Sequence, residues 1–194
     1  SNGDAKATLG RIDAGYSGFN LHVDAVTRDS NTISIPGSAH SDAAMDDEAE
    51  SNGTMENSDS RADSFSAGLS WVADDVVIGF SYSKLDSNYG LPPASHNHEG
   101  HDEHGEDHEG EEHSEESEEF VRIDMQQESY QTKLLVADLG DFLGQLDVDY
   151  AYTDYQHTEL EFEPDTGAGT VMIGSLIESL SHNLRAELTH NEYL

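Results

Sequence analysis

The sequence contains no cysteine and no long apolar run. Without cysteine, the 194-residue chain forms neither disulfides nor thiolate metal sites, so any metal must bind through nitrogen and oxygen atoms. No apolar run approaches the roughly 18 residues of a membrane-spanning helix. A membrane-spanning β-strand needs only about 9 to 11 residues with alternate positions apolar, so the sequence remains compatible with membrane strands.

Basic residues and catalytic motifs are also scarce. Lys and Arg together number 8 against 41 Asp and Glu, which gives a formal net charge of −33. This imbalance argues against nucleic acid as a partner, because phosphates require basic side chains, and it favours cations as ligands. The sequence has no GxSxG, P-loop or HExxH motif. We therefore predict that the chain is not an enzyme.

The apolar residues that are present recur at every second position, which is the period of a β-strand. Phe19, Leu21 and Val23 alternate with polar residues, and so do Val121 and Ile123. The pattern predicts an all-β fold of about seven strands. We expect them at residues 4–15, 19–30, 61–73, 75–88, 119–137, 142–160 and 181–193. The apolar segment 170–180 fits either the start of the last strand or a short helix in a loop.

Short and long connections alternate between the expected strands. The links at residues 16–18, 74 and 139–141 are short, and those at 31–60, 89–118 and 161–180 are long. In an antiparallel up-and-down meander, this places every long link at one end of the sheet. Outer-membrane barrels have this layout, with short periplasmic turns and long extracellular loops. The sequence thus predicts part of a larger transmembrane β-barrel. Its predicted anchors at the membrane interfaces are Tyr82, Tyr89, Tyr150, Tyr152 and Tyr155.

Residues 90–119 form a predicted extracellular loop rich in His, Asp and Glu. Over residues 96–119, six histidines are interleaved with twelve acidic residues, and no Lys, Arg or large apolar side chain interrupts them. Neutral imidazole and carboxylate groups suit Zn²⁺, whereas Cu²⁺ and Ni²⁺ are alternatives because Cu²⁺ binds such groups more tightly. The predicted metal ligands are His96, His98, His101, His104, His108, His113, Asp102 and Glu103. An acidic solvated loop without a bound metal is the competing interpretation.

Two further histidines lie within the expected strands. His157 precedes Glu159 and Glu161 at spacings of two, so the three side chains share one face of a strand. We predict that His157 is part of a second metal-binding site, and the alternative is an ordinary surface histidine. His22 lies between Asn20 and Asp24 and is interpreted as a polar wall residue. The acidic segment 40–59 contains only His40 and is interpreted as a solvated loop.

Several runs of the sequence resemble TonB-dependent outer-membrane receptors of the zinc-uptake type. The specific part is the order LDSNYGLP at 85–92, then the histidine-rich segment, then VRID at 121–124. Further similar runs are IPGSAH at 35–40, SDSRADSFSAGLSWV at 58–72, YTDYQHTELE at 152–161 and RAELTH at 185–190. The stretch 164–181 departs from the family pattern.

The resemblance implies a 22-strand barrel in the outer membrane of a Gram-negative cell, with an N-terminal plug domain inside it. Residues 1–194 would form only about a third of such a barrel and include no plug domain. The family imports a scarce metal with energy delivered by the TonB complex, so the resemblance implies active zinc transport by the full-length protein only. Lipid of the outer membrane would be a partner of the strands.

A soluble or periplasmic β-sheet protein that buffers metal, or passes it on as a chaperone, is the alternative function. The receptor and the soluble protein are expected to differ in the face of the sheet opposite the polar one. Apolar rows with aromatic ends indicate a membrane, whereas a sheet closed over its own core indicates a soluble protein. A third alternative is a fragment of a longer chain that refolds in solution, whose two open sheet edges would favour self-association.

Overall fold

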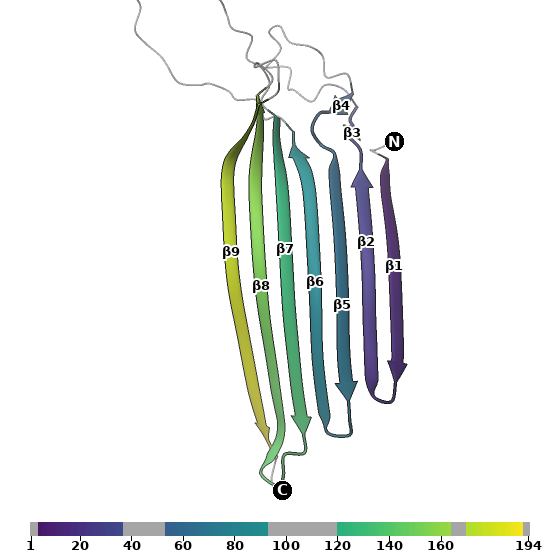
Figure 1. Ribbon diagram of the computed structural model, residues 1–194, viewed down its shortest axis with the longest axis vertical. Helices are drawn as coiled ribbons and strands as arrows, with labels where there is room; N and C mark the ends of the chain where they lie inside the picture. The colour runs from purple at the N-terminus through teal and green to yellow at the C-terminus, as the bar shows by residue number, and fades with distance from the viewer. Residues whose placement is uncertain (1–3, 37–52, 93–119, 164–169, 192–194) are drawn as a thin grey trace, which may run out of the picture.

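The computed structural model is an all-β protein built on one antiparallel sheet (Figure 1). The structure describes residues 4–36, 53–92, 120–163 and 170–191. The seven strands of the main sheet are β1 (Ala5–Tyr16), β2 (Phe19–Ser30), β5 (Ser60–Val72), β6 (Val76–Leu91), β7 (Phe120–Ala137), β8 (Leu143–Glu163) and β9 (Thr170–His190). They lie side by side in sequence order, so β1 and β9 form the two edges. The predicted antiparallel meander is confirmed.

The predicted strands need correction at the end of the chain. β9 begins at Thr170, so the prediction of a strand limited to 181–193 is wrong, and residues 170–180 are extended rather than helical. Periodicity alone did not distinguish these alternatives, and pairing with β8 favours the strand. The connection expected over 161–180 is therefore reduced to the six residues 164–169. The expected link 31–60 also contains a small hairpin of β3 (Ile33–Ser34) and β4 (Thr54–Met55).

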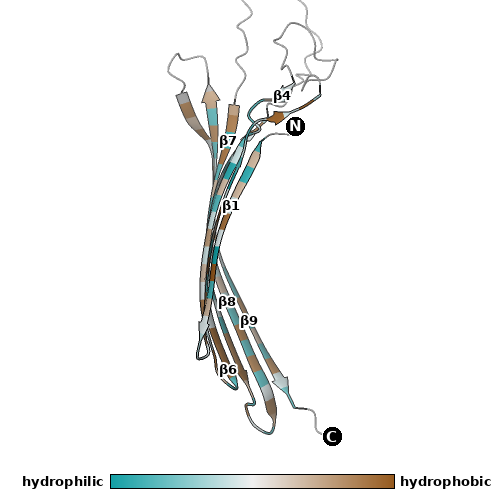
Figure 2. Ribbon diagram, turned by 90° about the vertical axis from the view of Figure 1, so that its right-hand side faces the viewer, coloured by the Kyte–Doolittle hydropathy of each residue, from teal (hydrophilic) through white to brown (hydrophobic). Residues whose placement is uncertain are grey.

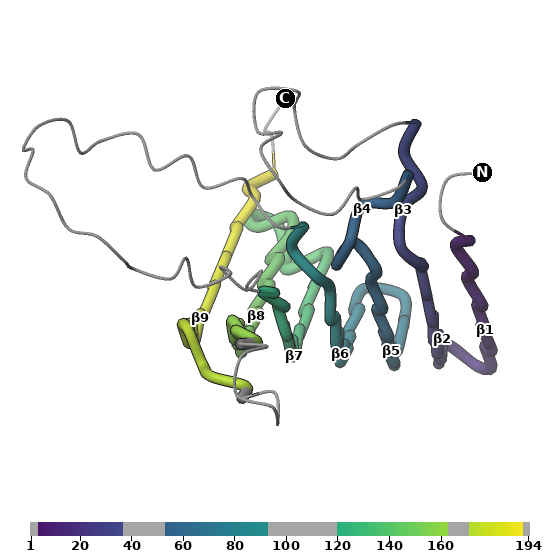
Figure 3. The backbone as a smooth tube through the Cα atoms, turned by 90° about the horizontal axis from the view of Figure 1, so that it is seen from above, coloured from purple at the N-terminus to yellow at the C-terminus, as the bar shows by residue number. Residues whose placement is uncertain are grey.

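The sheet has almost no core of its own. Among the described residues, Ile123 is the one buried large hydrophobic side chain, at 4% exposure, and Ser129 is the one buried polar side chain. Figures 2 and 3 show the strands as a single curved layer that no second described layer covers. Large apolar side chains such as Phe80 and Leu184 are instead more than half exposed. Backbone pairing between long strands therefore holds the sheet together more than apolar packing does.

The two faces of the sheet differ sharply in polarity. Because registered cross-strand partners share a face, the strand registers assign every side chain to one side. We call the first side the apolar face. Its members include Ile12, Tyr16, Phe19, Leu21, Val23, Phe65, Leu69, Trp71, Ile78, Phe80, Tyr82, Tyr130, Leu134, Val148, Tyr150, Tyr152, Leu184 and Leu188. Near the short turns, the opposite, polar face carries mainly charged residues, amides, hydroxyls and glycines. Nearer the long segments it also carries Leu85, Val121, Ile123 and Met125.

An aromatic row crosses the apolar face. The rings of Tyr82, Tyr130 and Tyr152 lie on adjacent strands, with centroids 5.0 and 6.0 Å apart, and His182 continues the row 5.1 Å beyond Tyr152. The next outward residues on β6, β7 and β8 are charged: they are Lys84, Glu128 and Asp154. At the other end of the same face, Phe19 and Trp71 lie 6.4 Å apart. Aromatic side chains thus flank the apolar part of this face at both ends. Tyr89 and Tyr155 lie on the polar face instead, so these two do not belong to the predicted outward anchors.

Three short links join neighbouring strands at the end opposite the long segments. β1 and β2 are joined by Ser17 and Gly18, which both have positive φ angles of 49° and 85°, as a type I′ hairpin turn requires. The Gly18 carbonyl accepts a 2.8 Å hydrogen bond from the backbone N–H of Val72, so this turn also meets β5. The short links predicted from the sequence are confirmed.

We expect Gly18→Ala to destabilise the sheet by about 1–2 kcal/mol or more. A non-glycine residue is strained at this φ angle, and its Cβ would overlap the carbonyl oxygen of Val72. Gly10→Ala is the matched control, because no heavy atom lies within 4 Å of its added Cβ and a strand gains from losing a glycine. Denaturant unfolding of the two variants tests this, and equal midpoints would contradict it.

Candidate functional site

The histidine-rich segment lies outside the residues that the structure describes. This applies to His96, His98, His101, His104, His108, His113, Asp102 and Glu103. The strands that flank it are described. Leu91 at the end of β6 and Val121 near the start of β7 are registered partners, so the chain leaves and re-enters the sheet at neighbouring positions.

The Arg122 side chain connects the start of β7 to the link that precedes β5. Its guanidinium donates hydrogen bonds of 3.0 and 2.9 Å to the two carboxylate oxygens of Asp59, a bidentate geometry. The same group donates to the Asn88 side-chain oxygen at 2.8 and 3.0 Å. Asp59 lies just before β5. Hydrogen bonds from the Arg122 guanidinium favour its charged carboxylate and so lower its pKa. We call Asn57, Asp59, Asn88 and Arg122 the staple.

Asn57 completes the staple by closing the end of the β6–β7 ladder. Its side-chain amide donates 2.7 Å hydrogen bonds to the carbonyl oxygens of both Leu91 and Val121. Gly90 makes room for it, since a Cβ at that position would overlap Asn57. An amide side chain therefore satisfies the last carbonyl groups before the histidine-rich segment begins. Sequence reasoning missed this group, because nothing in the spacing of the four residues indicates that they meet.

The structure places His157 on the polar face. His157 pairs with Met125 on β7 and Ile177 on β9, and its Nδ1 lies 3.1 Å from the Tyr155 hydroxyl. Glu159, two residues on, accepts a 2.8 Å hydrogen bond from Ser175. Within the described ranges, no group of three or more His, Asp or Glu side chains is arranged to hold a metal ion. His157 therefore has no assembled metal site here.

His22 is the centre of a charged network on the polar face. Its Nδ1 lies 2.7 Å from Asp13 and its Nε2 lies 2.7 Å from Asp24, so the ring bridges two carboxylates. Arg11 donates a 2.6 Å hydrogen bond to Asp13, and Ser66 donates one to Asp24. The network crosses β1, β2 and β5. The tight turn at Ser17–Gly18 fixes this register, so the pairing of Asp13 with His22 could have been found from the sequence.

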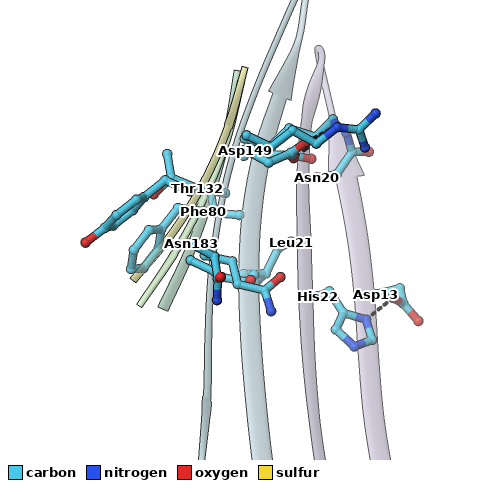
Figure 4. A pocket seen from close by; sticks show the side chains of 18 of the residues that line it. Asp13, Asn20, Leu21, His22, Phe80, Thr132, Asp149 and Asn183 are labelled. Carbon is cyan, nitrogen blue, oxygen red and sulfur yellow. Dashed lines mark hydrogen bonds and ion pairs between the residues drawn. The ribbon is translucent and has the colours of Figure 1, made fainter. Parts of the chain in front are cut away.

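A trough crosses the polar face beside this network (Figure 4). Its volume is about 840 Å³. Asp13, Asn20 and His22 form one side, whereas the other includes Lys133 and Arg185. Lys133 is held by Asp147 and Asp149 at 3.0 and 3.1 Å. The two sides therefore offer both signs of charge and several hydrogen-bonding groups.

The floor of the trough is made of small residues. On the polar face, β5 and β6 line it with Gly68, Ser70, Gly79 and Ser81, and the intervening Leu69 and Phe80 also border it. A Cβ at Gly68 or Gly79 would meet its nearest atoms at ordinary contact distances of 3.6 and 3.8 Å. The sheet itself therefore does not require glycine at either position. Glycine within a strand often marks the close approach of a ligand or another backbone, and this is the simplest physical reason for the shallow floor.

Comparison with known proteins adds no family assignment. No family model matches the chain, and no curated protein matches it significantly in sequence. The part of the chain that the structure describes contains no helix long and apolar enough to cross a membrane.

We expect the staple to make the free energy of unfolding decrease at acid pH. Because the folded pKa of Asp59 lies below its ordinary value of 3.8, the charged carboxylate stabilises the fold above that pH. This contribution is lost as the pH falls through the lowered value. Denaturant unfolding of the wild type and Asp59→Asn between pH 6 and 3 tests this. The difference in unfolding free energy should shrink on acidification, and a constant or growing difference would contradict the assignment.

Proposed function

We propose that the chain is part of an outer-membrane receptor for zinc, in which the histidine-rich segment captures metal ions at the cell surface. The observation that carries the proposal is the exposed apolar face of a sheet whose described residues have almost no core. Such a face requires an apolar environment. A soluble β-sheet buffer, the alternative function, would need another layer to cover it.

The dimensions of the apolar face support a lipid environment. Each of several strands contributes four successive outward apolar positions, for example Val76, Ile78, Phe80 and Tyr82 on β6, before charged residues begin. Four alternate positions span about 20 Å along a strand. Transmembrane barrels have an outward apolar band about 25 Å tall with aromatic residues at both edges. The row from Tyr82 to His182, and the pair Phe19 and Trp71, fit those edges.

Zinc capture is proposed for the histidine-rich segment from its composition. Several weak sites on one segment raise the local concentration of a metal. The surrounding carboxylates attract cations and speed their encounter, most strongly at low salt. Ligating imidazoles must be neutral, so capture should weaken as the pH falls through about 6.5. The close pairing of Leu91 with Val121 keeps both ends of the segment at one place on the sheet.

The polar face would line the interior of the barrel in this proposal. The resemblance to TonB-dependent receptors implies a plug domain inside the barrel, and the trough floored by Gly68 and Gly79 offers room for another backbone to approach. Closure of the barrel by further strands would satisfy the open backbone groups at the edges of β1 and β9. Import of zinc would then require the full-length protein and the TonB complex.

A pair of neighbouring arginine substitutions tests the membrane assignment. Phe80→Arg places a charge in the middle of the apolar face, whereas Ser81→Arg places the same charge on the polar face of the same strand. We expect Phe80→Arg to cost about 2–4 kcal/mol of folding free energy in lipid vesicles, and Ser81→Arg to cost far less. Denaturant titrations of the folded state in vesicles measure this. Equal costs would contradict the membrane assignment.

Titration calorimetry with Zn²⁺ tests metal capture. We expect a variant with the six histidines of the segment changed to alanine to lose several binding equivalents at pH 7.5. A variant with His182 and His190 changed to alanine is the control, and it should keep the wild-type stoichiometry. Repeating the wild-type titration at pH 5.5 should reproduce the loss, because protonated imidazole does not bind metal. Unchanged stoichiometry in the six-histidine variant would rule out capture by these residues.

A further inference from the structure

A second apolar surface lies on the same face of the sheet, beyond the aromatic row. Its six residues come from the ends of β7, β8 and β9 that lie far from the short turns. They are Phe120, Leu160, Phe162, Val171, Ile173 and Leu176. The registers pair Phe120 with Phe162 and Phe162 with Val171, and they pair Leu160 with Ile173. We call these residues the distal apolar patch.

The β9 side of the distal apolar patch is open to solvent, whereas Phe120, Leu160 and Phe162 are half-buried. Ile173 is 67% exposed, and Val171 and Leu176 are about half exposed, at 51% and 50%. The β-bulge at Gly174 keeps both Ile173 and Leu176 on this face. Without the bulge, one of the two side chains would turn to the polar face, where His157 and Ile177 lie. The bulge therefore makes the patch continuous along β9.

Lipid is a poor match for this patch. Leu160 lies eight residues beyond Tyr152 on β8, or about 26 Å along the strand. Asp154, Gln156 and Thr158 occupy the outward positions between them, and Glu178 occupies the corresponding position on β9. A carboxylate within the apolar part of a bilayer is unfavourable, so the membrane boundary belongs at the aromatic row. The patch then stands outside the bilayer.

The connecting segments next to the patch offer no apolar cover for it. The two connecting segments that join these strand ends are residues 93–119 and 164–169, and neither contains a large apolar side chain. A second copy is disfavoured by electrostatics, because each chain carries a net charge of −33. Asp124 borders the patch on β7, and Glu178 borders it on β9. Arg122, the register partner of Leu160, lies on the same face but is paired with Asp59, so the rim has a net negative charge as well.

We propose that the distal apolar patch docks a partner protein whose contact surface is apolar at its centre and basic at its rim. Apolar and aromatic residues at the centre of a contact, surrounded by complementary charge, are typical of protein interfaces. The placement of this surface outside the membrane rests on the proposed function. The shape and charge of the patch do not depend on the proposed function.

Photo-cross-linking of the protein in its own cells identifies the occupant. The cross-linker replaces Ile173 in the patch or Leu184 in the apolar face. We expect a protein adduct from position 173 and a lipid adduct from position 184. Lipid alone, a second copy of the chain, or no protein at position 173 would each overturn the proposal. A protein adduct at 173 without lipid at 184 would keep the docking surface and reject the membrane assignment.

Binding of the captured protein, once purified, then decides whether the patch recognises it. We expect Ile173→Glu to weaken its affinity at least tenfold. Ile177→Glu is the matched control, because Ile177 is on the same strand but on the opposite face, and this variant should bind as the wild type does. A basic rim predicts that affinity falls as salt concentration rises. An equal loss in both variants, or affinity independent of salt, would overturn the proposal.

Discussion

Continuous pairing of long antiparallel strands is the interaction on which the rest of this structure depends. β8 and β9 are paired over almost the whole of their 21 residues each, and they are interrupted only by two register shifts. Since the side-chain period of a strand is two, each register divides the sequence into an apolar and a polar face. The aromatic row, the staple, the trough and the distal apolar patch all result from this division. A slip of one residue in any pair would exchange the two faces of a strand.

Local geometry at a few positions keeps the registers in place. The turn at Ser17 and Gly18 starts the pairing of β1 with β2, and it also touches β5 through Val72. At the other end of the sheet, Asn57 holds the final pair of the β6–β7 ladder, and Arg122 links β7 to Asp59 and Asn88. These contacts are partly exposed, so each contributes modestly to the free energy of folding. Their effect is to define where the strands end rather than to supply most of the stability.

The sequence predicts the strands well, because a period of two is visible from the spacing of residues such as Phe19, Leu21 and Val23. It predicts their faces less completely, because apolar and aromatic residues such as Ile123 and Tyr155 lie on the polar face. It also predicts the short links. It does not predict that β9 begins at Thr170, because an apolar run without alternation fits a helix or a strand equally, and pairing with β8 decides. The staple was unpredictable for a different reason. Asn57, Asn88 and Arg122 meet only through the registers of three strands, and single-residue patterns carry no information on such contacts.

The distribution of charge links the fold to the proposed capture of metal. All eight Lys and Arg residues lie within strands, and six of them form ion pairs with strand or adjacent carboxylates, such as Arg11 with Asp13 and Lys133 with Asp147. The segment 93–119 therefore carries its acidic residues without any basic residue. Basic residues there would compete with metal ions for the carboxylates and would weaken the attraction of cations. Confining the positive charge to the sheet stabilises the strands and leaves the negative field of the segment uncompensated, as a metal-capturing segment requires.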